Sequence, residues 1–375
     1  MLPALRSRNY RLYFLGQGLS LIGTWTTQLA TVWLVYHLTQ SPLMLGLVSF
    51  TTQLPNLLLS PFGGVLVDRW NHRQTLLVTQ TLAMLQSFAL AVLALIGQIQ
   101  VWQIFGLALF QGLINAVDIP ARQAIVRDLV EDRDTLMNAI ALNSSMVHSA
   151  KLLGPAIGGL IISAVGAGYC FLIDGFSYAA VLLGLLAMRI PIRHREKSVL
   201  NITSVWQNLL EGIRYILASA PIRALLLLVG IVSFCGLSPT VVLPIYAAHL
   251  GLGAQALGLL MAAPGMGALL GAVMLMQRRG IQGLGRWVAF GPLLLGISMI
   301  GFAYSTSLWL SIFLLVLIGL GTLLQTACSN TIVQALVADD KRGRVMSFYV
   351  IAQLRGNRAW WGFKAAEMDS NAESP

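Results

Sequence analysis

Apolar stretches of about 20 residues or more recur along almost the whole chain, and they restrict its fold more than any other feature. A helix needs roughly 20 mainly apolar residues to cross the hydrocarbon core of a bilayer. Ten stretches meet this requirement, with the approximate bounds 12–37, 43–67, 75–97, 101–126, 139–166, 169–188, 222–248, 254–277, 287–305 and 308–335. The sequence therefore predicts an all-α membrane protein with ten spans.

Positive charges occupy alternate connections between these spans. The N-terminus is rich in Lys and Arg, as are the connections near 68–74, 127–138, 189–221, 278–286 and 336–344. The other five connections, near 38–42, 98–100, 167–168, 249–253 and 306–307, contain neither residue. Because basic loops stay in the cytoplasm, the alternation predicts a cytoplasmic N-terminus. It also explains the formal charge of +10 without a nucleic-acid partner.

The longest connection, 189–221, divides the chain into a bundle of six spans (1–188) and a bundle of four spans (222–344). Apolar residues at helical spacing within it, from Val205 to Leu217, predict a helix that lies along the inner membrane surface. The stretches 123–137 and 330–344 resemble each other, and the same offset relates Trp102 to Trp309. This similarity indicates two parallel repeats, an arrangement found in secondary transporters.

The region after the tenth span does not complete a second group of six. The apolar segment that begins at Val345 is interrupted at Arg355 after about a dozen residues, too few to cross a bilayer. We therefore expect residues 345–375 to form an aborted eleventh span and a polar tail. A truncated or frame-shifted product is the favoured explanation. A natural short form and a chain completed by a partner are the alternatives, and without such a partner we expect a monomer.

The connection after the second span carries a recognisable motif. It contains Gly64, Asp68, Arg69 and Arg73, in which the acid and the two arginines can form a latch on the inner side. The pattern resembles the GxxxDRxxxR signature loop of the major facilitator superfamily. An ordinary basic loop is the simpler alternative. The resemblance implies two helical bundles that rock about a central cavity lined by spans 1, 4, 7 and 10.

The fifth span carries a second motif, formed by Gly154, Pro155, Gly158 and Gly159. Pro155 removes one helical hydrogen bond, and the glycines permit a bend and close packing. The motif resembles the GPxxGG core of the antiporter branch of the same superfamily, whose members mostly export. The run from Asp118 to Ser144 resembles the branch that contains siderophore exporters and macrolide efflux proteins.

Charged residues inside the spans are candidates for function, because they are costly in hydrocarbon. Asp118 and Arg122 stand four apart on one helix, so they can pair. Helical rise places Asp118 about 12 Å and Lys151 about 20 Å from the inner ends of their spans. A Lys side chain can bridge much of that difference, so we expect Asp118 to be the nearest acid to Lys151. Asp174 lies nearer the outer surface and is expected to be a poorer partner.

These charges have two interpretations. In the functional one, Asp118 takes part in proton coupling and Lys151 contacts or gates an anionic or polar substrate. In the structural one, an ion pair holds spans 4 and 5 together. Uncharged polar residues in the spans are expected to line the cavity or to bond between helices: Gln28, Asn56, Gln111, Asn115, Gln325, Ser329 and Asn330.

Several functional classes are excluded or disfavoured. The chain has no GxxxxGK[ST] motif, so ATP cannot drive it through that motif. Its cysteines and histidines show no metal-ligand spacing, and no enzyme site, metal or cofactor is expected. We predict a multi-pass protein of the bacterial cytoplasmic (inner) membrane that exports a small amphipathic molecule, such as a siderophore or macrolide, in exchange for protons. An inactive truncated membrane protein and a nutrient importer with the same fold are the alternatives.

Overall fold

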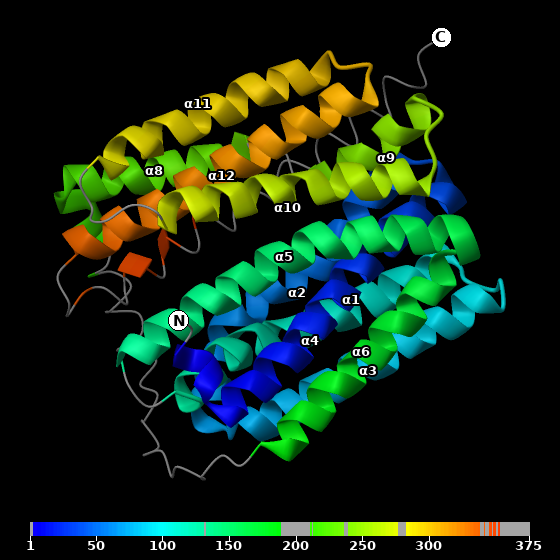
Figure 1. The fold of residues 1–375 in the computed structure, drawn as a ribbon, viewed down its shortest axis with the longest axis horizontal. Helices are drawn as coiled ribbons and strands as arrows, with labels where there is room; N and C mark the ends of the chain where they lie inside the picture. Colours follow the sequence, from blue (N-terminus) through cyan, green and yellow to red (C-terminus); the bar gives the residue numbers. More distant parts are fainter. Residues whose placement is uncertain are drawn as a thin grey trace. The chain divides into compact units, whose positions relative to one another are not determined.

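The computed structural model describes residues 3–130, 133–188, 211, 213–235, 239–276, 283–337, 341, 345–346, 348–349 and 352. Within these ranges the chain is helical and contains no strand, which confirms the predicted all-α class (Figure 1). The elements are η1 (Pro3–Arg6), α1 (Arg8–Thr39), α2 (Pro42–Arg69), α3 (His72–Leu95), α4 (Val101–Asp128), α5 (Arg133–Val165), α6 (Ala167–Ala187), α8 (Ala220–Cys235), α9 (Pro239–His249), α10 (Ala254–Met276), α11 (Leu284–Ala303) and α12 (Leu308–Leu336).

Seven of the described helices are long and apolar enough to cross a membrane: α3, α4, α5, α6, α10, α11 and α12. Helix α1 is also long, but its apolar residues alternate with Gly, Thr and Gln. The predicted span 222–248 corresponds to α8 and α9, and residues 236–238 between them lie outside the described ranges. The exact count of six plus four spans therefore stays a prediction.

The predicted surface helix and tail fall largely outside the described residues. Residues 213–218, at the end of the predicted surface helix, are helical, whereas 189–210 are not described. In the tail, Val345 and Tyr349 are buried against α8 and α12. The Tyr349 hydroxyl donates to the carbonyl oxygen of Thr326 at 2.7 Å.

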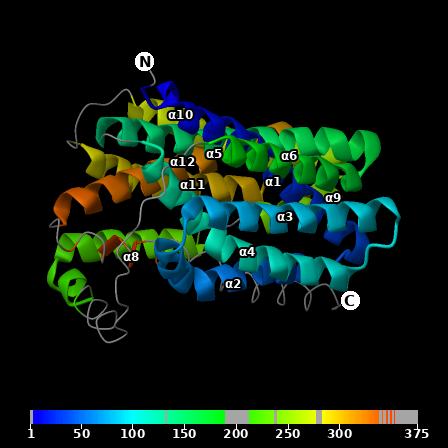
Figure 2. The same cartoon turned by 90° about the horizontal axis from the view of Figure 1, so that it is seen from below.

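The chain forms two compact units. The first contains α1 to α6 together with α9 and the first part of α10, and the second contains α8, the rest of α10, α11 and α12. The division predicted at 189–221 falls mostly on residues outside the described ranges and stays a prediction. In the first unit, α3 packs against both α4 and α6 (Figure 2), and α1 packs against α5 and α6.

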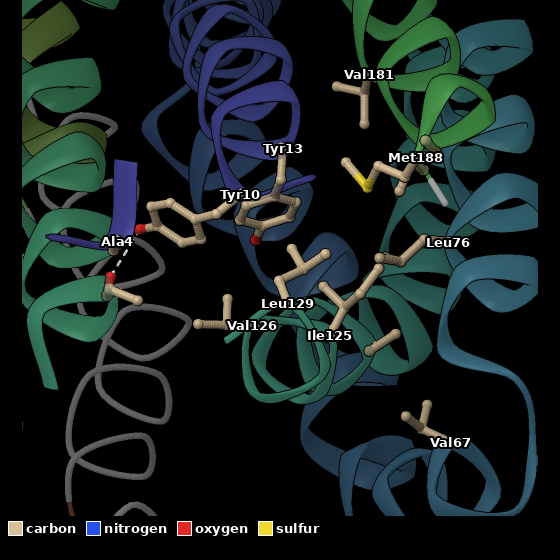
Figure 3. Close-up of a cluster of buried hydrophobic side chains, with 13 residues drawn as sticks. Ala4, Tyr10, Tyr13, Val67, Leu76, Ile125, Val126, Leu129, Val181 and Met188 are labelled. Atoms are coloured by element: carbon tan, nitrogen blue, oxygen red, sulfur yellow. Dashed lines mark hydrogen bonds between the residues drawn. The ribbon is translucent and has the colours of Figure 1, made fainter. Parts of the chain in front are cut away.

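The helices of the first unit alternate in direction, so one end gathers the starts of α1, α3 and α5 and the ends of α2, α4 and α6. We call it the basic end, since Arg8, Arg11, Arg73 and Arg127 lie there. An apolar cluster fills this end, with the two rings of Tyr10 and Tyr13 near its centre (Figure 3). Members from every one of the six helices contribute: Ala4, Tyr10, Tyr13, Val67, Leu76, Ala121, Ile125, Val126, Leu129, Ala139, Val181, Leu185 and Met188.

Helices α4 and α12 support the predicted internal repeat. The offset that relates Trp102 to Trp309 also relates Val101, the first residue of α4, to Leu308, the first residue of α12. Both tryptophans are therefore the second residue of their helix, and both are exposed, at 68% and 75%. Amphipathic indole rings at the end of an apolar helix are typical of a membrane–water interface.

Candidate functional site

Asp118 is the centre of a buried polar cluster between α3 and α4. The turn of α4 brings Arg122 onto the same face, and the two side chains form an ion pair. The Oδ1 atom of Asp118 accepts hydrogen bonds from Thr79 Oγ1 and Gln80 Nε2, both at 2.8 Å. The residue is 2% exposed. The carboxylate is therefore compensated by one cation and two neutral donors, and the predicted pairing with Arg122 is confirmed.

Lys151 does not join this cluster. Its Nζ lies over the indole ring of Trp25 in α1, 5.2 Å from the ring centroid. Among the described residues, no ion pair or hydrogen bond of the Lys151 side chain is found. Arg122 pairs with the carboxylate of Asp118, whereas Lys151 packs on α1. That Asp118 is the nearest acid to Lys151 stays a prediction.

His148 extends this positive region of α5. It precedes Lys151 by three residues, close enough for the two side chains to interact electrostatically. Its Nδ1 atom is buried and has no hydrogen-bond partner in the part of the chain that the structure describes. Two nitrogen-bearing side chains thus lie near each other on one helix without an observed acidic partner.

The Gly154-Pro155 motif lies one turn beyond Lys151, and α5 continues through it as a helix. Proline at 155 has no N–H, so the carbonyl oxygen of Lys151 loses its usual partner four residues on. The Thr26 hydroxyl on α1 donates to the carbonyl oxygen of Gly154, next to the proline, at 3.0 Å. A Cβ atom at Gly154 would lie 2.9 Å from the carbonyl oxygen of Ile22. Glycine is therefore needed for this approach of α5 to α1.

Gly158 also faces α1, at Thr26 and Leu29, whereas Gly159 serves a second contact in the same unit. A Cβ atom at Gly258 of α10 would lie 2.9 Å from the Cα of Gly159, and one at Gly159 would lie 3.0 Å from the Cα of Gly258. Backbones approach this closely only through small residues, as in other membrane helix pairs. The four residues of the motif therefore hold α5 tightly between α1 and the start of α10.

Asp174 in α6 is a second buried acid, also 2% exposed. The Ser87 hydroxyl on α3 donates to its Oδ2 at 2.8 Å, and the Ser177 hydroxyl lies 3.4 Å from its Oδ1. Gly23 of α1 lies directly against it, since a Cβ atom there would be 2.7 Å from Oδ1. No cationic side chain pairs with this carboxyl group among the residues described.

The predicted cavity residues show mixed environments. Gln111 donates to Asn115 Oδ1 at 3.2 Å, while its own Oε1 is buried without a partner in the described chain. Gln28 and Asn56 are half-buried. In the second unit, Gln325 Nε2 is buried without a partner among described residues, and Asn330 accepts from Gln334 at 3.0 Å. A cavity formed by these residues stays a prediction.

The predicted latch is described only in part. The side chains of Asp68 and Arg69 lie outside the described structure, and Gly64 falls within α2. Arg73 donates from Nε to the carbonyl oxygen of Leu185 at 2.7 Å and from Nη2 to that of Leu186 at 3.0 Å. It thereby satisfies terminal carbonyls of α6 and places a cation at the negative end of that helix.

Sequence reasoning missed four residues that complete these sites. His72 Nδ1 lies 2.6 Å from Asp128 Oδ2 and joins the start of α3 to the end of α4. Thr79 and Gln80 bind Asp118, and Trp25 supports Lys151. The sequence contains one sign of the Asp118 cluster, the polar pair Thr79-Gln80 inside an apolar span. Such residues usually form hydrogen bonds with a polar side chain of another helix.

Comparison with known proteins identifies relatives over nearly the whole chain. A family model described as transmembrane secretion effector matches residues 1–372. The staphyloferrin A transporter of Staphylococcus aureus is 26% identical over 342 residues, which cover 90% of this chain and 84% of that protein. The enterobactin exporter EntS of Salmonella typhi is 26% identical over 265 residues, which cover 70% of this chain and 62% of the exporter.

Solved structures show the same fold. A bacterial homologue of the human lysosomal transporter Spinster, in an inward-facing and unoccupied conformation, matches with a TM-score of 0.71 and 16% identity, over 96% of this chain and 82% of that one. A bacterial homologue of the iron transporter ferroportin, inward-facing, matches with a TM-score of 0.69 and 16% identity, over 96% and 91% of the two chains. At this identity the likeness concerns the fold alone.

Proposed function

The chain belongs to the transmembrane secretion effector family of major facilitator transporters, and on that basis we propose that it exports a small amphipathic anion in exchange for protons. The proposed location is the bacterial cytoplasmic membrane, with the N-terminus inside and the chain acting as a monomer. Two relatives carry names that specify siderophores, one of them as an exporter. A siderophore is accordingly the substrate class that we favour, ahead of a macrolide.

One observation supports an anionic substrate most directly: the Lys151 ammonium is held in a spanning helix against an aromatic ring. A cation–π contact contributes about 0.5–2 kcal/mol. The effective cost of removing an ion from water is several kcal/mol. The ring therefore offsets only part of the cost, and an anionic group of a bound substrate would supply the rest. His148 adds a neighbouring donor for the same group.

The proposed site is placed where binding can affect helix packing. Lys151 lies one turn before Pro155, where the helix has lost one hydrogen bond, and just before the glycine contacts of α5 with α1 and α10. A substrate that draws the ammonium away from Trp25 would alter the contact of α5 with α1. Such a change is the kind of step that alternating access between two bundles requires.

Proton exchange requires an acid within the spans that can gain and lose its charge. The described spanning helices offer Asp118 and Asp174, which are both buried. Asp118 was the expected carrier, but its carboxylate already pairs with Arg122 on the same helix. This pair lies within α4, so it is not the ion pair between spans 4 and 5 that the structural interpretation describes.

Import on the same fold is the second candidate, because the name of the staphyloferrin A transporter specifies no direction. Export and import can be distinguished in cells that lack their own siderophore exporters and express this chain. We expect labelled enterobactin or staphyloferrin A made inside these cells to appear in the medium. Faster entry of the added compound, with no release, would overturn export.

A further inference from the structure

We infer that Asp174 on α6, rather than Asp118, takes up and releases the proton, an inference that rests on the proton exchange proposed above. The buried environment of Asp174 lacks the cation that fixes the charge of Asp118. Its carboxyl oxygens are approached by two serine hydroxyls, Ser87 on α3 and Ser177 on α6. Neutral donors of this kind can rotate, so they can serve both the ionised and the protonated form.

Asp118 is poorly suited to the same task. Neutralising it would leave the partly buried Arg122 guanidinium without its counter-charge, and breaking such a pair is unfavourable. Thr79 and Gln80 also donate to the same carboxylate, so Asp118 is held by three side chains. For Asp174 the situation is reversed. Burial without a nearby cation disfavours its charged form, and no cation loses its counter-charge when the carboxyl group becomes neutral.

The other groups around Asp174 are consistent with this role. On α1, the Thr27 hydroxyl lies close to the carboxyl group. Among the described residues, the titratable side chains Cys170 and Tyr178, both on α6, are close enough to interact with Asp174. Cys170 is directed to the carbonyl oxygen of Gly158, and the Tyr178 hydroxyl lies 3.4 Å from that of Thr24. None of these neighbours supplies a positive charge.

Helix α1 connects Asp174 physically with Lys151. Gly23 of α1 lies against the carboxyl group of Asp174, and Trp25, two residues later, lies beneath Lys151. Residues two apart on a helix point to nearly opposite sides. The carboxyl group of Asp174 therefore contacts one side of α1, and the proposed substrate site contacts the opposite side. Both protonation and substrate binding can thus affect the packing of this helix.

The proton step is simple to balance. One carboxylate oxygen of Asp174 binds one proton that enters from the outer side, forming an O–H bond. The same bond breaks when the proton is released to the cytoplasm, and no electrons are transferred. One such cycle accompanies the outward movement of substrate.

Infrared difference spectroscopy of the full chain in lipid tests the assignment without any substrate. We expect the wild type to show a protonated-carboxyl band that disappears as the pH is raised. Asp174→Asn should lose the band, and Asp118→Asn should keep it. Ser87→Ala retains the carboxyl group but removes a donor to its ionised form, so its band should disappear at higher pH.

The outcomes separate this inference from the proposed function. A band that persists in Asp174→Asn, or that is lost only in Asp118→Asn, overturns the assignment, as does the absence of any titrating band in the wild type. Thermal unfolding of each variant shows whether it is folded. If Asp174→Asn is not folded, Ser87→Ala tests the assignment instead. An unmoved band in Ser87→Ala would then overturn the inference. Failure to transport siderophores would instead contradict the proposed substrate, whatever the spectra show.

Discussion

The Lys151 ammonium lies over the indole ring of Trp25, so the buried cation of α5 is supported by α1 and not by an acid. This arrangement differs from a structural ion pair, in which both charges are satisfied before any ligand arrives. Asp118 and Arg122 show that other arrangement within a single turn of α4. Helix α4 therefore contains a complete charge pair, whereas α5 contains a cation for which no acidic partner is found among the described residues.

Replacement of Lys151 by glutamine should reduce export of an anionic siderophore by about tenfold or more. A charge-assisted hydrogen bond is worth about 1.5–3 kcal/mol, and 1.4 kcal/mol corresponds to a factor of ten. Lys151→Arg keeps the charge and should retain part of the activity. The measurement is the rate of labelled-siderophore release from cells with matched amounts of protein.

The matched control for this variant is Lys341→Gln. Lys341 is a partly exposed residue that pairs with Glu211 at 3.7 Å in the second unit. Its replacement should leave release unchanged. Equal release by Lys151→Gln and the wild type would remove Lys151 from the substrate site.

Asp118→Asn should destabilise the fold, because it leaves the partly buried Arg122 guanidinium without its carboxylate. Breaking a fully buried pair by removing one partner costs about 3–5 kcal/mol, and a smaller loss is expected here because Arg122 is 23% exposed. The double variant Asp118→Asn with Arg122→Gln removes both charges and should be more stable than the single variant. Thermal unfolding in detergent measures both, and a single variant as stable as the wild type would contradict the structural role.

Gly258→Ala should weaken the contact of α10 with α5. The added Cβ atom would lie 2.9 Å from the Cα of Gly159, so the two backbones must separate. Overpacking of this kind typically costs about 1–3 kcal/mol, and the loss of export should accompany a lower unfolding temperature. Gly106→Ala on α4 is the control, since its Cβ atom would meet nothing within 4 Å. If both variants behave alike, close packing at Gly258 is not important.

The long helices could be predicted from the sequence because their limits are set locally. The span predicted at 308–335 is observed as Leu308–Leu336, and that at 101–126 as Val101–Asp128. Apolar runs bounded by polar connections determine such limits without tertiary information. The Asp118–Arg122 pair was predictable for the same reason, since four residues along a helix bring two side chains together.

The partners between helices could not be predicted, because they depend on which faces meet. Nothing local to Lys151 specifies that Trp25, far away in sequence, lies beneath it. Similarly, the sequence places the acid Asp174 inside a span but does not specify which residues surround it. Its contact with Gly23 and its bond with Ser87 arise from the packing of α6 against α1 and α3.

Transport by everted membrane vesicles tests the central claim of anion export in exchange for protons most directly. Vesicles that contain the wild-type chain should accumulate labelled enterobactin when respiration acidifies their interior, and a protonophore should abolish the accumulation. Vesicles that contain Lys151→Gln should accumulate less enterobactin by a factor of about ten or more, because the charge-assisted contact is lost. Accumulation that survives the protonophore, or that is equal in Lys151→Gln vesicles, would contradict the account.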